Sequence, residues 1–265
     1  MSDPALFQYV LGLADDQLVL GHRLSQWIGR APILEEELAL SNIALDLIGQ
    51  SRSLYQYAGE LEGAGLDEDT LAYHRDARGY LNLTLVEQPN GDFAKTIARQ
   101  LFYTAMAVPF WQAMTASKDQ RLASVAAKAE KEAAYHLRHA TEWTARLGDG
   151  TEESHRRMQA AIDQRWEFTG ELFEMNSAEA GMAEAGIASD RLSLRDIWDR
   201  TVNAALLEAT LTRPADSWMA KGGRNGLHGE DLGRMLAEMQ SLQRMHPGLS
   251  VRLQQQLDSS STTLR

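Results

Sequence analysis

Apolar side chains recur along this chain at three- and four-residue spacing, which is the period of an amphipathic helix rather than the alternation of a strand. No long alternating β-branched segment is present, whereas Ala, Leu, Glu and Gln are abundant. Only six prolines interrupt the 265 residues. The pattern predicts an all-α fold.

The first 150 residues predict four long helices, at 4–29, 33–59, 92–117 and 119–147. Their starts carry N-cap or first-turn residues, namely Asp3, Pro4, Pro32, Asp92 and Asp119. Gly148 follows the last of these helices as a stop signal. The polar segment 60–90, with short helical stretches near Thr70-Leu71 and at 81–86, is expected to cross between two helix pairs. Two long pairs joined by one crossover are typical of the ferritin-like four-helix bundle.

The second helix has an unusual pattern, because two apolar stripes follow it. One comprises Leu34, Leu38, Leu45 and Ile48; the other comprises Leu40, Ile43, Leu47 and Leu54. Two stripes predict a helix buried on most sides. In the third helix, Pro109 is expected to cause a kink.

Beyond residue 150 the pattern stays helical. A fifth helix, capped by Asp149 or Thr151, is predicted to continue to Phe173, and further helical stretches follow at 178–185, 193–211 and 232–246. These stretches are too small for a separate core and are expected to pack on the bundle. We therefore predict one domain over 1–250, with a core at about 4–147 and added helices at about 151–246, and a polar, disordered tail at 251–265.

Composition narrows the range of functions. Lys and Arg total 26 against 37 Asp and Glu, a net charge of −11, and no basic run is available to bind a nucleic acid. No apolar stretch approaches the roughly 18 residues of a membrane span, and the first residues do not resemble a signal peptide. There are no cysteines, which excludes thiolate metal sites and cysteine nucleophiles. A cytoplasmic location is expected.

A di-iron site in a ferritin-like bundle needs one carboxylate from each of two helices and a Glu-x-x-His pair from each of the other two. Among the seven histidines, only His155 follows a glutamate, Glu152, by three positions. That pair lies in the first turn of the fifth helix, outside the four-helix unit, where acidic residues favour the positive end of the helix dipole. We interpret it as part of the helix start rather than as a metal site.

The nearest approximation within the bundle lies in the fourth helix. Glu132 and His136 are four residues apart, and Tyr135 takes the position expected for a histidine ligand. In the second helix, Asp46 is followed at the third position by Gly49. The sequence therefore predicts a di-iron scaffold without its di-iron, with no catalytic residue, no metal ligand and no cofactor of its own.

Four residues near these degenerate positions, Asp15, Asp46, Glu132 and His136, are predicted to form a buried or interfacial polar network, or a solvated face. We expect side chains, including Tyr135, to fill the space between the helices, and Tyr135 or His136 to hydrogen-bond a carboxylate such as Asp46.

A glycine-rich loop at 221–226 offers one other candidate site. Lys221 and Arg224 could contact an anionic ligand such as a phosphate, or a partner chain. A glycine-rich segment of this kind is more often an ordinary surface loop.

Five blocks in order along the chain resemble the phenylacetyl-CoA epoxidase family, specifically its C-type subunits, the PaaC type; they lie at 20–27, 34–50, 86–94, 146–155 and 226–233. The resemblance extends from about residue 4 to about 248. It implies a ferritin-like subunit of a multicomponent oxygenase that uses O2 to convert phenylacetyl-CoA to its ring 1,2-epoxide. In that family the di-iron centre belongs to a paralogous A-type subunit, the C-type subunit is structural, and a reductase supplies electrons from NADPH.

Three functions remain open at this stage. The first is a non-catalytic structural subunit that pairs with a catalytic A-type subunit, the reductase and the other components of the complex. The second is a di-iron oxygenase or oxidase with irregular ligands drawn from Asp15, Asp46, Glu132 and His136. The third is a free-standing acyl-CoA-binding protein, suggested only by Lys221 and Arg224.

Overall fold

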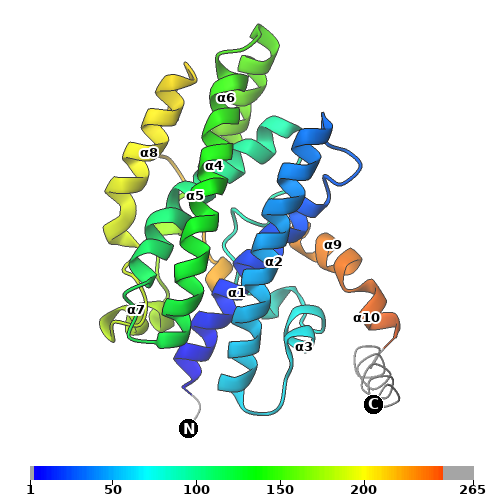
Figure 1. Cartoon of the computed structure of the whole chain (residues 1–265), viewed down its shortest axis with the longest axis vertical. Helices are drawn as coiled ribbons and strands as arrows, with labels where there is room; N and C mark the ends of the chain where they lie inside the picture. Colours follow the sequence, from blue (N-terminus) through cyan, green and yellow to red (C-terminus); the bar gives the residue numbers. More distant parts are fainter. Residues whose placement is uncertain (1–2, 247–265) are drawn as a thin grey trace, which may run out of the picture.

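The computed structural model describes residues 3–246. Within this range the chain forms ten α-helices, four short 3-10 turns and no strand. The predicted all-α class is confirmed, and the arrangement is consistent with a ferritin-like bundle (Figure 1).

Four long helices make up the bundle: α1 (Pro4–Ser25), α2 (Leu34–Glu62), α4 (Phe93–Met114) and α5 (Gln120–Gly148). α1 packs along α2 and α4 along α5, and α2 also contacts α5. The predicted caps are present, because the side chains of Asp3, Asp92 and Asp119 each accept hydrogen bonds from backbone N–H groups of the first turn.

α1 ends at Ser25, four residues before the predicted end. Residues 26–30 form turns, and Gly29 adopts a left-handed φ of 76°. The indole of Trp27 donates to Thr96 Oγ1 at 3.1 Å and packs edge-on against Phe93, so this segment is held against α4. α4 ends at Met114 rather than 117 and stays helical through Pro109.

The crossover contains the short helix α3 (Glu68–Tyr73) and the 3-10 turn Ala77–Gly79. The helix predicted at 81–86 is wrong, because residues 81–83 are irregular and 84–86 form a turn. Its backbone N–H groups bind side chains instead of helix carbonyls: Leu81 donates to Asp15, Leu83 to Asp16 and Thr84 to Glu171, at 2.7–2.8 Å.

The later helices are α6 (Glu152–Trp166), α7 (Ser177–Glu184), α8 (Arg195–Glu208), α9 (Glu230–Met239) and α10 (Ser241–Met245). Thr151, one of the two predicted caps, begins α6. α6 ends at Trp166, and a 3-10 turn at Gly170–Phe173 replaces its predicted last turn. α8 lies on one side of the bundle and α9 with α10 on the opposite side (Figure 1).

These later helices share the core of the bundle. Trp198 of α8 is fully buried and donates its indole N–H to the carbonyl of Phe102 on α4 at 2.9 Å. Phe102 and Trp198 both contact Trp166 of α6, with ring centroids 5.5 and 5.7 Å apart. The aromatic cluster therefore joins α4, α6 and α8 through a common apolar contact.

The two apolar stripes of α2 have opposite environments. Leu40, Ile43, Leu47 and Leu54 are at most 3% exposed, whereas Leu34, Leu38, Leu45 and Ile48 are 68, 58, 67 and 39% exposed. The prediction that α2 is buried on most sides is therefore wrong for the chain alone. One stripe faces α1 and the bundle core, and no described element covers the other.

Two further predictions concern the limits of the chain. The expected polar tail at 251–265 lies outside the described residues. Among residues 3–246, no helix combines the length and the apolar character needed to cross a membrane.

Candidate functional site

Amide side chains converge at the centre of the bundle. Gln17 of α1, Gln50 of α2 and Gln100 of α4 are each at most 4% exposed. With His136 of α5 they line a cavity of about 10 Å³, which is about the space of one water molecule. The carbonyl oxygens of all three amides lack a hydrogen-bond donor among the described residues.

This donor set does not fit a di-iron centre. The ferritin-like arrangement uses four carboxylates and two histidines to balance the charge of the two iron ions, and an amide oxygen is neutral. Within residues 3–246, no three or more Asp, Glu, His or Cys side chains lie close enough together to hold a metal. The carboxylates near this part of the bundle do not converge on one point: Glu132 bonds to Gln50, Asp46 to His136, and the buried Glu36 to His139 at 2.8 Å.

The predicted contact between His136 and Asp46 is confirmed. His136 Nε2 lies 3.1 Å from Asp46 Oδ2, which joins α5 to α2. Burial lowers the pKa of His136 below its ordinary value, although the hydrogen bond and the charge of Asp46 oppose that shift. Glu132 instead accepts a hydrogen bond from Gln50 at 2.8 Å and pairs with Lys128.

Tyr135 does not fill the bundle interior as expected. Its side chain is 43% exposed, and the guanidinium of Arg138 lies 5.2 Å from its ring centroid. On a helix, neighbouring residues point about 100° apart, so the burial of His136 on the inward face places Tyr135 at the edge of that face.

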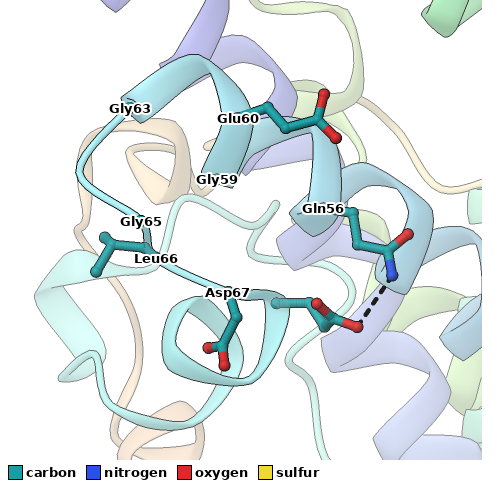
Figure 2. A pocket seen from close by; sticks show the side chains of 8 residues that line it. Gln56, Gly59, Glu60, Gly63, Gly65, Leu66 and Asp67 are labelled. Carbon is teal, nitrogen blue, oxygen red and sulfur yellow. Dashed lines mark hydrogen bonds between the residues drawn. The ribbon is translucent and has the colours of Figure 1, made fainter.

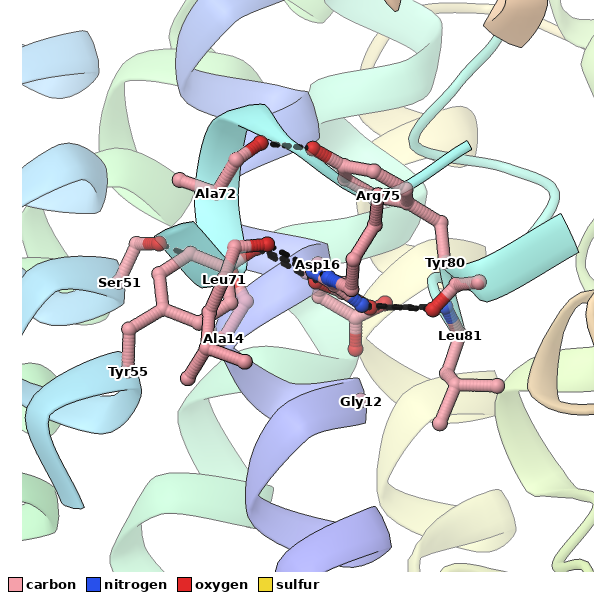
Figure 3. A network of polar contacts seen from close by, with 12 residues as sticks. Gly12, Ala14, Asp16, Ser51, Tyr55, Leu71, Ala72, Arg75, Tyr80 and Leu81 are labelled. Atoms are coloured by element: carbon pink, nitrogen blue, oxygen red, sulfur yellow. Dashed lines mark hydrogen bonds and ion pairs between the residues drawn. The ribbon is translucent and has the colours of Figure 1, made fainter. Parts of the chain in front are cut away.

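Asp15 belongs to a different network. Its carboxylate binds the guanidinium of Arg75, the hydroxyl of Tyr55 and the backbone N–H of Leu81. Figure 3 shows Arg75 between Tyr55 and Tyr80, with the Tyr80 hydroxyl bonded to the carbonyl of Ala72. This cluster ties α1 and α2 to the crossover, and Asp15 forms no bond with Asp46, Glu132 or His136. The structure therefore joins His136 to Asp46 and places Asp15 in a separate network.

The two cations of the 221–226 loop also differ in location. Arg224 is 7% exposed and pairs with Asp16 of α1 at 2.6 Å and with Glu179 of α7 at 3.0 Å. Burial by itself would lower the pKa of Arg224, but these two carboxylates raise it above its ordinary value. Arg224 is therefore a buried structural cation whose guanidinium donates to groups of the protein itself, whereas the Lys221 side chain is 70% exposed.

The buried pair of His228 and Glu87 was not predicted. His228 Nδ1 lies 2.7 Å from Glu87 Oε2, and its Nε2 lies 2.8 Å from the carbonyl oxygen of Tyr80. A carbonyl can only accept, so Nε2 carries a proton, and the carboxylate favours a second proton on Nδ1. Burial would lower the pKa of His228, but the bonds to Glu87 and Tyr80 raise it above its ordinary value.

The residues missed from the sequence carried only weak signals. Gln17 and Gln50 each occupy a position within an apolar stripe, Gln17 between Leu13 and Leu20 and Gln50 between Leu47 and Leu54. A polar residue at such a position indicates a buried polar contact. Nothing near His228 in the sequence indicates Glu87, because 141 positions separate the two.

A surface cleft of about 490 Å³ lies between the end of α2 and the loop leading to α3 (Figure 2). Its carboxylates already have partners: Glu68 binds Gln56 and Arg52, Glu60 binds Arg121, and Asp67 caps α3. No histidine or hydroxyl nucleophile lines it. The carboxylates of the cleft are therefore held by contacts within the protein.

Comparison with known proteins identifies relatives over almost the whole chain. The model of the phenylacetic acid catabolic protein family matches residues 1–250. The chain is 52% identical over 243 residues to the C-type subunit of the 1,2-phenylacetyl-CoA epoxidase of Escherichia coli (strain K12). The alignment covers 92% of this chain and 98% of that protein.

Proposed function

The chain belongs to the phenylacetic acid catabolic protein family, and from this we propose that it is the C-type subunit of a phenylacetyl-CoA epoxidase complex. In this function it is a non-catalytic, ferritin-like partner of a paralogous A-type subunit that holds the di-iron centre. A reductase supplies electrons from NADPH, and the complex uses O2 to form the ring 1,2-epoxide. A cytoplasmic location agrees with this function.

The observation that carries the non-catalytic assignment is the amide set at the bundle centre. Gln17, Gln50 and Gln100 occupy the interior where a working di-iron site requires carboxylates, and the carboxylates that are present have structural partners. A bundle can keep its fold without the metal site because the apolar core around these residues supplies most of the stability. The same observation disfavours an oxygenase with irregular ligands.

The acyl-CoA-binding alternative depended on Lys221 and Arg224. Arg224 already pairs with two carboxylates inside the protein. Its guanidinium is therefore not available to bind a phosphate. One exposed lysine is a poor site for a multiply charged ligand.

The test is epoxidation of phenylacetyl-CoA by a complex reassembled from this chain, the A-type subunit and the reductase with NADPH and O2. With H136A or E132Q in a fully assembled complex, we expect turnover within about threefold of wild type, since no transition state depends on these groups. Iron analysis of the separated chains should find about two irons in each A-type chain and only background in this one.

A fall in turnover of several orders of magnitude, with assembly intact, would show that His136 or Glu132 takes part in the chemistry. Iron bound stoichiometrically to this chain alone would also contradict the proposal.

A further inference from the structure

The amide groups at the bundle centre carry hydrogen-bond acceptors that no described residue serves. Gln17, Gln50 and Gln100 are 2, 4 and 1% exposed, and they come from α1, α2 and α4. All three line the cavity of about 10 Å³, and the carbonyl oxygen of each lacks a donor among residues 3–246. A buried acceptor without a donor is rare in a folded protein, because it has lost its contact with bulk water without gaining a partner.

The orientation of the Gln50 amide follows from the bond that its nitrogen makes. Gln50 Nε2 donates to Glu132 Oε2 at 2.8 Å, and Glu132 also pairs with Lys128 at 3.1 Å. An ionised carboxylate can only accept, so the nitrogen and the oxygen of this amide cannot be exchanged. Glu132 is not among the residues that line the cavity. The carbonyl of Gln50 therefore lies on the side of the amide that is turned away from Glu132.

Tyr103 of α4 brings a donor to the same cavity. Its hydroxyl accepts a hydrogen bond from Gln17 Nε2 at 2.7 Å, and its side chain lines the cavity beside the three amides. Burial raises the pKa of Tyr103 above its ordinary value, so the hydroxyl keeps its proton. A hydroxyl can accept and donate at the same time, and this proton has no acceptor among the described residues.

We propose that this cavity binds one water molecule, which donates to two of the three amide carbonyls and accepts from the hydroxyl of Tyr103. Three hydrogen bonds are typical of a buried water, and a space of about 10–15 Å³ is the smallest that holds one. The water joins α1, α2 and α4 in the interior of the bundle, where metal ions join the helices of a metal-containing ferritin-like protein. This inference is independent of the proposed function.

A neutral ligand fits the site better than a cation. The three carbonyls and the phenol are uncharged. The carboxylate of Glu132 already bonds to Gln50, and that of Asp46 bonds to His136. A charge that is buried without an opposite charge costs far more than a buried polar group that is hydrogen-bonded. A dry cavity is disfavoured as well, because the cavities that stay empty are lined by apolar groups.

The first experiment is a high-resolution crystal structure of the full-length chain, from crystals soaked in rubidium chloride. We expect one peak in the cavity, at about 2.6–3.2 Å from the Tyr103 oxygen and from at least two of the amide oxygens. The peak should refine as water and show no anomalous signal at the rubidium edge.

The second experiment counts the long-lived waters in solution by ¹⁷O magnetic relaxation dispersion. The test variant carries Q50M and Q100M, which keep the size of both side chains and leave at most one amide acceptor for the water. The matched control carries Q56M and Q112M on the same two helices. It loses a similar amide–carboxylate bond, because Gln56 donates to Glu68 at 3.0 Å, and Gln112 is exposed. We expect one water fewer in the test variant and the wild-type number in the control.

An anomalous rubidium peak among the amides would overturn the proposal in favour of a monovalent cation site. Amide groups bonded directly to one another, with no peak between them, would overturn it too. The same number of long-lived waters in the wild type and in the folded test variant would also contradict it. If the test variant does not fold, the crystal structure of the wild type still decides between these outcomes.

Discussion

At the scale of residues, buried carboxylates organise the irregular segment at 81–84. Asp15, Asp16 and Glu171 accept hydrogen bonds from consecutive parts of the 81–84 backbone, and Glu87 accepts one from Gly229 at 2.8 Å. Burial of a carboxylate costs solvation energy, which these bonds and the neighbouring arginines offset. The loss of a cation from such a cluster therefore leaves a charge that has neither water nor a partner.

Replacement of His228 by Gln tests this cost and its pH dependence. The folded-state pKa of His228 is raised, so its contribution is complete below the unfolded value of about 6.5 and is lost as the pH rises through the folded value. At pH 6, H228Q should lower the free energy of unfolding by about 3 kcal/mol, because Glu87 loses its buried partner. The loss should shrink at pH 9.

Urea unfolding of both proteins between pH 5.5 and 9 measures this difference. The control is H246Q, which removes an exposed histidine that bonds to no carboxylate of residues 3–246. A difference that stays constant across this range would contradict protonation of His228 in the folded state.

At the scale of elements, Gly148 shows how a contact rather than a turn requires glycine. The sequence suggested that Gly148 stops the fourth long helix, but α5 includes it, and Asp149 is the C-cap with φ −97°. A Cβ at Gly148 would lie 2.3 Å from the carbonyl oxygen of Ala209, where the chain leaves α8. Glycine at this position lets the end of α5 approach the backbone after α8.

The variant G148A is therefore expected to destabilise the protein by about 1–3 kcal/mol, since the backbone near Ala209 must move away. Gly49 of α2 is the matched control, because nothing lies within 4 Å of a Cβ placed there. G49A should stabilise the helix by about 0.5–1 kcal/mol. Chemical unfolding measures the change in the free energy of unfolding for each variant. The same change in both variants would contradict the steric explanation.

At the scale of the whole molecule, the aromatic cluster of Phe102, Trp166 and Trp198 links the bundle to the helices that follow it. We propose that residues 1–250 form one cooperative unit, since the described part of this range shares a continuous apolar core from Leu6 to Leu236.

Replacement of Trp198 by Ala tests whether these residues unfold as one cooperative unit. The variant should lose about 3–5 kcal/mol of stability, because it opens a cavity among three elements and removes the bond to Phe102. In both proteins, far-UV circular dichroism and tryptophan fluorescence should report the same unfolding midpoint. Separate transitions, with the bundle signal unaffected by W198A, would show that the later helices form an independent unit.

The sequence by itself determined the all-α class, the four long helices and the caps of three of them. Those features depend on the helical period and on contacts within one turn, as at Asp3, Asp92 and Asp119. It also indicated the departure from di-iron ligands at Tyr135 and Gly49, since the ligand spacing is a property of single helices. One contact between helices, His136 with Asp46, followed from pairing the nearest polar groups of two predicted helices.

Only the tertiary structure decided which of the two α2 stripes is buried, that residues 81–86 are not helical, and that Arg224 pairs with Asp16 across 208 positions. The local pattern is the same for a buried and an exposed apolar stripe, and for a free and a paired arginine. The difference lies in which distant segment supplies the neighbouring surface or the opposite charge. That choice is made by the packing of the whole chain, where burying a charge is tolerated only beside its partner.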